Sequence, residues 1–143
     1  MTEKLHDILT KYDKDQYAIN TGTETHKKMR FVNILDDDDG VVVQIKSHPE
    51  LAIFFTPDAK TEVPIAAKIK DKFVSRRIDR MVIDDDKKTI HILDYKTDVD
   101  KNAFRANYVA QVKEYVDIIK KIYPKYTVCG YILWLHDWTL EKL

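Results

Sequence analysis

The order of strand and helix signals in the second half of the chain most constrains its fold. Four runs rich in β-branched and aromatic residues predict strands at residues 62–69, 73–83, 89–95 and 126–135. The polar Lys70-Asp71-Lys72 joins the first two as a hairpin. Apolar residues at positions 104, 108, 112, 115, 119 and 122 predict a long helix over residues 103–123. Because a helix between two parallel strands makes a right-handed crossover, we predict an α/β fold with a central mixed β-sheet flanked by helices.

The first part of the chain gives weaker signals. Residues 1–20 are polar and predict either a short helix or a mobile lead-in, and residues 21–143 are expected to form a single domain. A helix is predicted over residues 26–35. Residues 41–45 have β propensity, but the run is too short to distinguish a strand from a helix. The aspartates at 36–39 are expected to form a solvated acidic turn rather than a metal site.

Charge is balanced over the whole chain but not along it. Lys plus Arg and Asp plus Glu both number 24, which excludes a strongly basic nucleic-acid-binding tail and an acidic solvating protein. Residues 1–60 carry 8 basic and 11 acidic residues, a net charge of −3, and residues 61–143 carry 16 and 13, a net charge of +3. The basic excess is densest between Lys68 and Arg80. A local nucleic-acid site is therefore compatible with the neutral total.

Several classes of cofactor and location are excluded by what the sequence lacks. Cys129 is the only cysteine, so an internal disulfide, a zinc ribbon and a cysteine-held iron–sulfur cluster are excluded. Its apolar neighbours predict a buried strand, where it acts as a small hydrophobe rather than a nucleophile. No Gly-x-x-x-x-Gly-Lys-Ser/Thr pattern is present, so we expect no ATP site. With neither a signal peptide nor an apolar run of spanning length, we expect a soluble cytoplasmic protein without membrane association.

Charged residues follow the apolar part of the third predicted strand. Residues two apart share a face of a strand, so Asp94 and Lys96 project to the same side as Ile90 and Ile92. A buried carboxylate needs a partner, which can be Lys96, a metal ion or both. The preceding hairpin can bring Asp79 to the same place, and Mg²⁺ or Mn²⁺ prefers such oxygen ligands. An ordinary ion pair at the end of a strand is the simpler interpretation of Asp94 and Lys96 alone.

Polar residues on the two predicted helices have a structural and a functional interpretation. Gln111 and Tyr115 are four residues apart and share one face of the long helix with Tyr108. Gln111 either bonds an internal backbone group or reaches the site. His26 lies in the first turn of its helix, where it is either solvent-exposed, a capping residue or an additional ligand beside the carboxylates.

Five motifs occur together in an order that resembles a known family. They are Gly22-Thr23-x-x-His26, Glu62-Val63-Pro64, Ile78-Asp79-Arg80, Asp94-Tyr95-Lys96-Thr97 and Gln111-x-x-x-Tyr115. Residues 21–143 thereby resemble the RecB-type nucleases of the PD-(D/E)XK superfamily. The resemblance is closest to the C-terminal nuclease domain of the AddA subunit of bacterial AddAB helicase–nucleases. It implies a restriction-endonuclease-like fold.

The resemblance implies a role for each matching residue. Four groups would bind Mg²⁺ or Mn²⁺: the side chains of His26, Asp79 and Asp94 and the backbone carbonyl of Tyr95. Lys96 would be the catalytic lysine and Gln111 a further residue of the catalytic site. Glu62 matches the acidic residue that precedes the family's hairpin. DNA contacts are expected from Arg76, Arg77, Arg80 and Tyr115, and Arg76 departs from the glycine that the family usually has at its position.

These residues lead to two functional hypotheses. The first is a metal-dependent DNA nuclease, expected to act as an exonuclease in double-strand-break repair and recombination in a bacterial cytoplasm. DNA would be delivered by a helicase or an AddB-like partner subunit. The second is a catalytically degenerate nucleic-acid-binding or scaffold domain of the same fold. The trio of Asp79, Asp94 and Lys96 favours the first, because folding alone does not require it.

Overall fold

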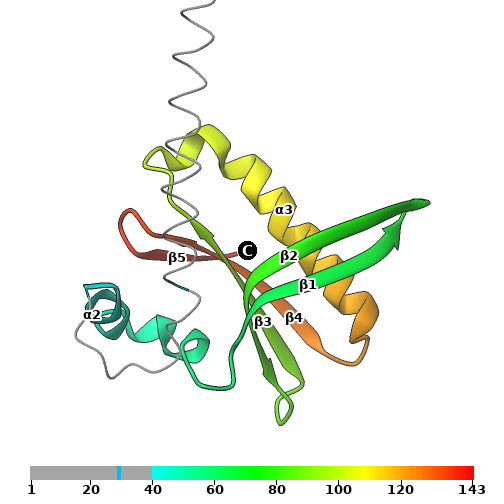
Figure 1. The fold of residues 1–143 in the computed structure, drawn as a ribbon, viewed down its shortest axis with the longest axis horizontal. Coiled ribbons are helices and arrows are strands. Elements are labelled where there is room, and N and C mark those ends of the chain that lie inside the picture. The colour runs from blue at the N-terminus through cyan, green and yellow to red at the C-terminus, as the bar shows by residue number, and fades with distance from the viewer. Residues whose placement is uncertain (1–28, 30–39) are drawn as a thin grey trace, which may run out of the picture.

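A mixed β-sheet organises the part of the chain that the computed structural model describes, which is Met29 and residues 40–143 (Figure 1). The elements in chain order are α2 (Gly40–Lys46), the 3-10 helix η1 (Pro49–Phe54), β1 (Lys60–Ile69), β2 (Lys72–Asp84), β3 (Thr89–Lys96), α3 (Lys101–Ile122), β4 (Thr127–Trp134) and β5 (Thr139–Lys142). The strands lie in the order β1-β2-β3-β4-β5. The predicted 1–20 segment, the helix at 26–35 apart from Met29, and His26 lie outside the described residues.

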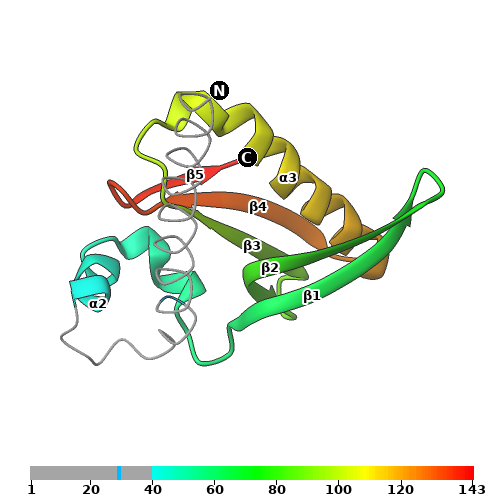
Figure 2. The same cartoon turned by 45° about the horizontal axis from the view of Figure 1, so that its top comes forward.

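The pairing of the strands confirms the predicted mixed sheet with flanking helices. β3 and β4 are parallel, and the other neighbouring pairs are antiparallel. α3 connects the two parallel strands and packs along one face of the sheet (Figure 2). A parallel pair requires such a crossover, which explains why a long helix separates these two strands in the sequence.

The sheet has a hydrophobic core on each side. On β3 the side chains alternate, with Ile90 and Ile92 packing toward α3 and Leu93 and Tyr95 packing toward the α2–η1 side. Four of its residues in succession, 92–95, are buried, as expected for an interior strand covered on both faces. The second layer consists of residues from before the sheet, namely Met29, Ile45, Leu51, Phe54 and Phe55.

α3 begins with a side-chain cap and buries the middle of its length. The carboxylate of Asp100 accepts hydrogen bonds from the backbone amides of Asn102 and Ala103, which satisfies donors of the first turn. The buried residues are Val112, Tyr115, Ile118 and Ile119. Phe104 and Ile122, expected in the apolar stripe, are 50% and 51% exposed, because they lie near the two ends of the helix.

A glycine lets α3 approach β4 closely. A Cβ atom at Gly130 would lie 2.7 Å from Cγ1 of Val112 and 3.0 Å from Cγ2 of Val116. Real carbon atoms do not approach so closely, so any larger residue at this position would displace the helix from the sheet. Gly130 therefore helps to set the distance between the crossover helix and the strand that follows it.

Two elements add to the sequence-based expectation. Residues 41–45, for which the sequence left strand and helix open, belong to the helix α2. β5 is a strand that the sequence did not predict, because only four residues pair and a turn containing Trp138 at φ 56° precedes them. Within residues 40–143 no helix is long and apolar enough to cross a bilayer.

Arg80 lies in the second core rather than on the surface. It is 0% exposed, and its guanidinium donates hydrogen bonds to the Tyr95 hydroxyl at 2.7 Å and the Phe54 carbonyl at 3.0 Å. A third bond, 2.7 Å long, reaches the carbonyl of Met29. The ring centroid of Phe55 lies 4.4 Å from the guanidinium carbon. The expectation that Arg80 contacts DNA is therefore wrong, because its charged group is enclosed and joins the sheet to the preceding layer.

This environment predicts a large effect of Arg80→Ala on stability. The substitution would leave buried carbonyls unpaired and create a cavity, so we expect a loss of about 3 kcal/mol or more in the free energy of unfolding. Arg77→Ala is the matched control, because that side chain is 70% exposed and lies 3.5 Å from Glu62, an arrangement worth about 1 kcal/mol or less. Urea denaturation measures both, and equal losses would contradict a structural role for Arg80.

Candidate functional site

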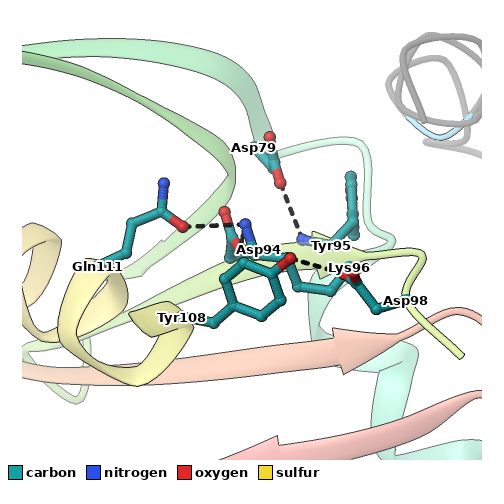
Figure 3. A network of polar contacts seen from close by, with 7 residues as sticks. All are labelled: Asp79, Asp94, Tyr95, Lys96, Asp98, Tyr108 and Gln111. Carbon is teal, nitrogen blue, oxygen red and sulfur yellow. Dashed lines mark hydrogen bonds and ion pairs between the residues drawn. The ribbon is translucent and has the colours of Figure 1, made fainter. Parts of the chain in front are cut away.

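Two carboxylates oppose each other on neighbouring strands. The antiparallel ladder pairs Arg80 of β2 with Leu93 of β3, and the same register brings Asp79 opposite Asp94. The backbone amide of Tyr95 donates a hydrogen bond of 2.8 Å to Oδ2 of Asp79. Figure 3 shows both carboxylates at this end of β3, with side chains of α3 beside them. The structure therefore brings together Asp79 and Asp94, which the sequence predicted to meet.

A change in the direction of β2 positions Asp79. Val74 and Ile78 pack in the core on the α3 side, but so does Met81, so the simple alternation of faces breaks between Ile78 and Met81. On β1, Glu62 adopts φ 52°, and the β1–β2 ladder is interrupted at this residue. A left-handed backbone is unfavourable for a glutamate and bends the strand locally. Glu62 thus lies opposite Asp79, and its carboxylate pairs with the exposed Arg77 at 3.5 Å.

Asp94 is the most enclosed carboxylate of the site. Its side chain is 5% exposed, and its Oδ2 lies 2.9 Å from Nζ of Lys96. That approach lacks the direction of a hydrogen bond, and no donor among the described residues makes one to Oδ2. Burial, and secondly the charge of Asp79, raise the pKa of Asp94 to about 7, against the opposing effect of Lys96. A buried oxygen therefore has an ion-pair partner but an unused hydrogen-bonding capacity.

Lys96 is held on three sides. Besides Asp94, its ammonium donates a hydrogen bond of 2.9 Å to Oε1 of Gln111 and lies 4.3 Å from the ring centroid of Tyr108. The Tyr108 hydroxyl in turn donates to Oδ2 of Asp98 at 2.8 Å. Gln111 thus reaches the site, in line with the functional interpretation of its position on the helix. The ion pair and the cation–π contact are of the kind that fix a flexible lysine in one position.

Sequence reasoning missed Tyr108 and Asp98 as members of the site. Tyr108 was placed on the same helix face as Gln111, three residues away, but no contact with Lys96 was expected. Asp98 lies two residues after Lys96, beyond the end of β3. The spacing on the helix is a usable signal for Tyr108, whereas only the path of the chain after β3 brings Asp98 to the tyrosine hydroxyl.

Tyr115 is a core residue. It is 3% exposed and packs among the apolar residues between α3 and the sheet. Burial and the charge of Asp94 raise the pKa of its phenol to about 12, so the ring stays uncharged at neutral pH. The expected DNA contact of Tyr115 is therefore corrected to packing beneath the carboxylates, because its side chain lies below the surface.

Arg76 lies beside the site and reaches α3. Its Nε donates a hydrogen bond of 2.8 Å to Oε1 of Glu114, and its side chain is 43% exposed. The two residues line an open pocket of about 400 Å³, together with Asn107, Tyr108, Ala110 and Gln111. This pocket is thus bordered by the exposed charge of Arg76, by its partner Glu114 and by Gln111, the amide that holds Lys96.

The site offers two carboxylate groups to a metal ion. Within Met29 and residues 40–143, no three His, Cys, Asp or Glu side chains converge on one point. Asp79 and Asp94 nonetheless supply oxygen donors, and Oδ2 of Asp94 is buried and makes no hydrogen bond among the described residues. Oxygen donors of this kind suit Mg²⁺ or Mn²⁺ and not a soft metal. Neither a scan against protein-family models nor a search of curated proteins finds a match to this chain.

The raised pKa of Asp94 predicts an unusual pH dependence of stability. Because the folded-state value of about 7 lies above the ordinary 3.8, the folded protein holds more protons than the unfolded chain between about pH 4 and pH 7. In metal-free solution the free energy of unfolding should fall as pH rises through this window, on the order of a few kcal/mol. Asp94→Asn should abolish the fall and stabilise the protein at pH 8, as measured by urea denaturation.

Asp137→Asn provides the control, because the pKa of this carboxylate is lowered whereas that of Asp94 is raised. The hydrogen bond from Lys101 lowers the pKa of Asp137 to about 2. Its contribution to stability is therefore present above pH 4 and lost in acid, so removing it should leave the fall between pH 4 and pH 7 in place. A wild-type stability that rises over this window would contradict the assigned environment of Asp94.

Proposed function

We propose that this chain is a divalent-metal-dependent nuclease of the PD-(D/E)XK type that hydrolyses phosphodiester bonds in DNA. The observation that carries the proposal is the opposition of Asp79 and Asp94 on β2 and β3, with Lys96 beside the buried Asp94. The five-stranded mixed sheet with α3 as its crossover is compatible with the restriction-endonuclease-like fold that these motifs imply.

The carboxylate pair fits a divalent cation on electrostatic grounds. Two negative charges close together repel, and the buried Oδ2 of Asp94 has the Lys96 ammonium as an ion-pair partner but makes no well-formed hydrogen bond among the described residues. Asp79 and Asp94 would hold Mg²⁺ or Mn²⁺, with the Tyr95 carbonyl and His26 as further ligands proposed from the resemblance. When bound, such an ion neutralises phosphate charge and lowers the pKa of a coordinated water.

Residues around the carboxylates supply a positive charge to the site and hold it in place. Lys96 places a positive group at the carboxylates, where it can orient a water or stabilise the negative charge that develops on the phosphate. Gln111 and the Tyr108 ring restrict the ammonium to that position. Asp98 orients Tyr108 through its hydroxyl. Arg76, at the border of the adjacent pocket, can meet a phosphate of the bound strand if it leaves Glu114.

A catalytically degenerate DNA-binding or scaffold domain is the second candidate. It is favoured by the ion pair of Arg76 with Glu114, which spans from β2 to α3 beside Gln111 where the family usually has a glycine. Such a domain would bind DNA without cleaving it. The trio of Asp79, Asp94 and Lys96 supports the nuclease, because the repulsion between two opposed carboxylates destabilises a metal-free fold, and the hydrogen bond that Asp79 accepts from Tyr95 does not require a second carboxylate beside it.

The cellular setting that we propose is repair or recombination in a bacterial cytoplasm, with exonucleolytic cleavage. The formal net charge of zero gives the chain little long-range attraction for DNA. A helicase or an AddB-like partner subunit that delivers the strand would compensate for this weak hold.

A cleavage assay with matched substitutions tests the proposal. The full chain should degrade end-labelled linear DNA, single- or double-stranded, only when Mg²⁺ or Mn²⁺ is added. Asp94→Asn and Lys96→Gln should each lower the rate at least about 100-fold, because they remove a metal ligand and a charge-stabilising group. The surface pair of Lys101 and Asp137 offers chemically identical controls, Lys101→Gln and Asp137→Asn, which should keep the wild-type rate.

The outcomes separate the two candidates. Cleavage that survives Asp94→Asn and Lys96→Gln equally would contradict this site. DNA binding by the wild type with no metal-dependent cleavage would identify the degenerate domain instead. Stabilisation of the wild type but not of Asp94→Asn by Mn²⁺, measured as a shift in Tm, checks the metal site independently of turnover.

A further inference from the structure

The tip of the β1–β2 hairpin carries an exposed aromatic side chain among lysines. Phe73 is 76% exposed, more than any other large hydrophobic residue in the described part of the chain. Lys68 is its direct cross-strand partner, and Lys70 and Lys72 lie at the turn beside it. In Figures 1 and 2 this end of the hairpin extends away from the rest of the sheet.

The hairpin is anchored along one face, which leaves Phe73 on the other. Ile65 and the partly buried Ile69 and Val74 belong to the core that includes Ile118 of α3. Nζ of Lys121 at the end of α3 also donates a 3.4 Å hydrogen bond to the backbone carbonyl of Lys68. Because successive residues of a strand face opposite sides, the side chain of Phe73 points away from this packed face. A fixed strand therefore presents the ring to solvent.

The backbone of the turn adds a second observation. Lys70 and Asp71 have φ values of 48° and 66°, so both central residues of this two-residue turn are left-handed. Asn and Gly fit such a turn best, and a lysine there costs on the order of 1 kcal/mol. The two central residues carry opposite charges, and residues 68–73 hold three lysines against one aspartate, a net charge of +2 around the exposed ring.

We propose that the hairpin tip binds an unpaired nucleic-acid strand. One base would stack on Phe73, and backbone phosphates would contact Lys68, which pairs with Phe73 on the same face, and Lys70 at the turn. Stacking on an exposed aromatic ring beside cationic side chains is the general way in which single strands are held without regard to sequence. A protein-binding patch would instead be depleted of lysine around its apolar centre.

This second contact would lie outside the proposed nuclease site. It rests on the proposed function in one respect, which is that both positions bind the same nucleic-acid strand. Phe73 lies six residues from Asp79 along β2, which corresponds to about 20 Å of extended strand. At about 3.4 Å per stacked nucleotide, roughly six nucleotides separate the two positions. The tip would thus hold the strand at a distance from the bond that is cleaved.

Binding of a fluorescent 20-nucleotide single strand by the full chain in EDTA tests the inference without cleavage. Phe73→Ala should weaken binding about fivefold or more, whereas Phe73→Trp should retain it. Ile122→Ala is the control, since it removes another exposed apolar side chain, 51% exposed, from the end of α3. Equal affinities of Phe73→Ala and Ile122→Ala would overturn the inference. So would concentration-dependent self-association of the wild type that Phe73→Ala abolishes without changing its DNA affinity.

The lysines are tested through the salt dependence of the same binding. Replacing Lys68 and Lys70 by Gln together should reduce the slope of log affinity against log salt by about 1.4, which is about 0.7 for each phosphate contact on a single strand. Replacing Lys46 and Lys60 by Gln removes the same charge from exposed positions on α2 and at the start of β1. An equal change of slope for both pairs would contradict a specific site at the tip.

A small phosphodiester separates this inference from the proposed function. Bis(p-nitrophenyl) phosphate is too short to reach both the carboxylates and the tip. Its Mn²⁺-dependent hydrolysis should be lost in Asp94→Asn and unchanged in Phe73→Ala. Binding that depends on Phe73 without any hydrolysis by the wild type would support the tip and refute the nuclease. Hydrolysis by the wild type, with no effect of Phe73→Ala on DNA binding, would support the nuclease and refute the binding site at the tip.

Discussion

The parallel pairing of β3 with β4 requires α3 to cross the sheet, and the arrangement of the site depends on this crossover. The helix lies over the face of β3 from which Asp94 and Lys96 project, so Gln111 and Tyr108 of the helix contact the Lys96 ammonium. Gly130 allows the helix backbone to approach β4 as closely as these contacts need. A crossover helix displaced from the sheet would separate Lys96 from the residues that hold it.

The carboxylate pair is the point at which stability and function conflict. Burial of Asp94 opposite Asp79 favours its protonated form, because burial first and the charge of Asp79 second raise the pKa of Asp94. Arg80 in the second core is different, because hydrogen bonds to Tyr95, Phe54 and Met29 satisfy its buried charge. A bound divalent cation would relieve the repulsion, so the same arrangement that destabilises the metal-free protein equips it for phosphodiester chemistry.

Positive groups divide into structural and accessible ones, although they follow one another along β2. Arg80 is enclosed, Arg76 is paired with Glu114 at a pocket beside the site, and Arg77 is largely exposed. Together with the lysines around Phe73, these accessible charges belong to β1, β2 and the turn that joins them. The local basic excess of a neutral chain is therefore concentrated on the element that would guide a strand to the site.

The sequence predicted the strand–helix–strand order and, from the two-residue period of a strand, that Asp94 and Lys96 share a face. It offered Asp79 as a neighbour without fixing it and left Gln111 with two interpretations, and the pairing of β2 with β3 and the crossover of α3 decided both. Tertiary structure alone decided the rest. Arg80 is buried because a layer from before the sheet covers it, and α2 is helical despite its β propensity. Tyr108 holds Lys96 because the crossover brings the two elements together, and its helical spacing from Gln111 marks only their shared face, not the contact with β3.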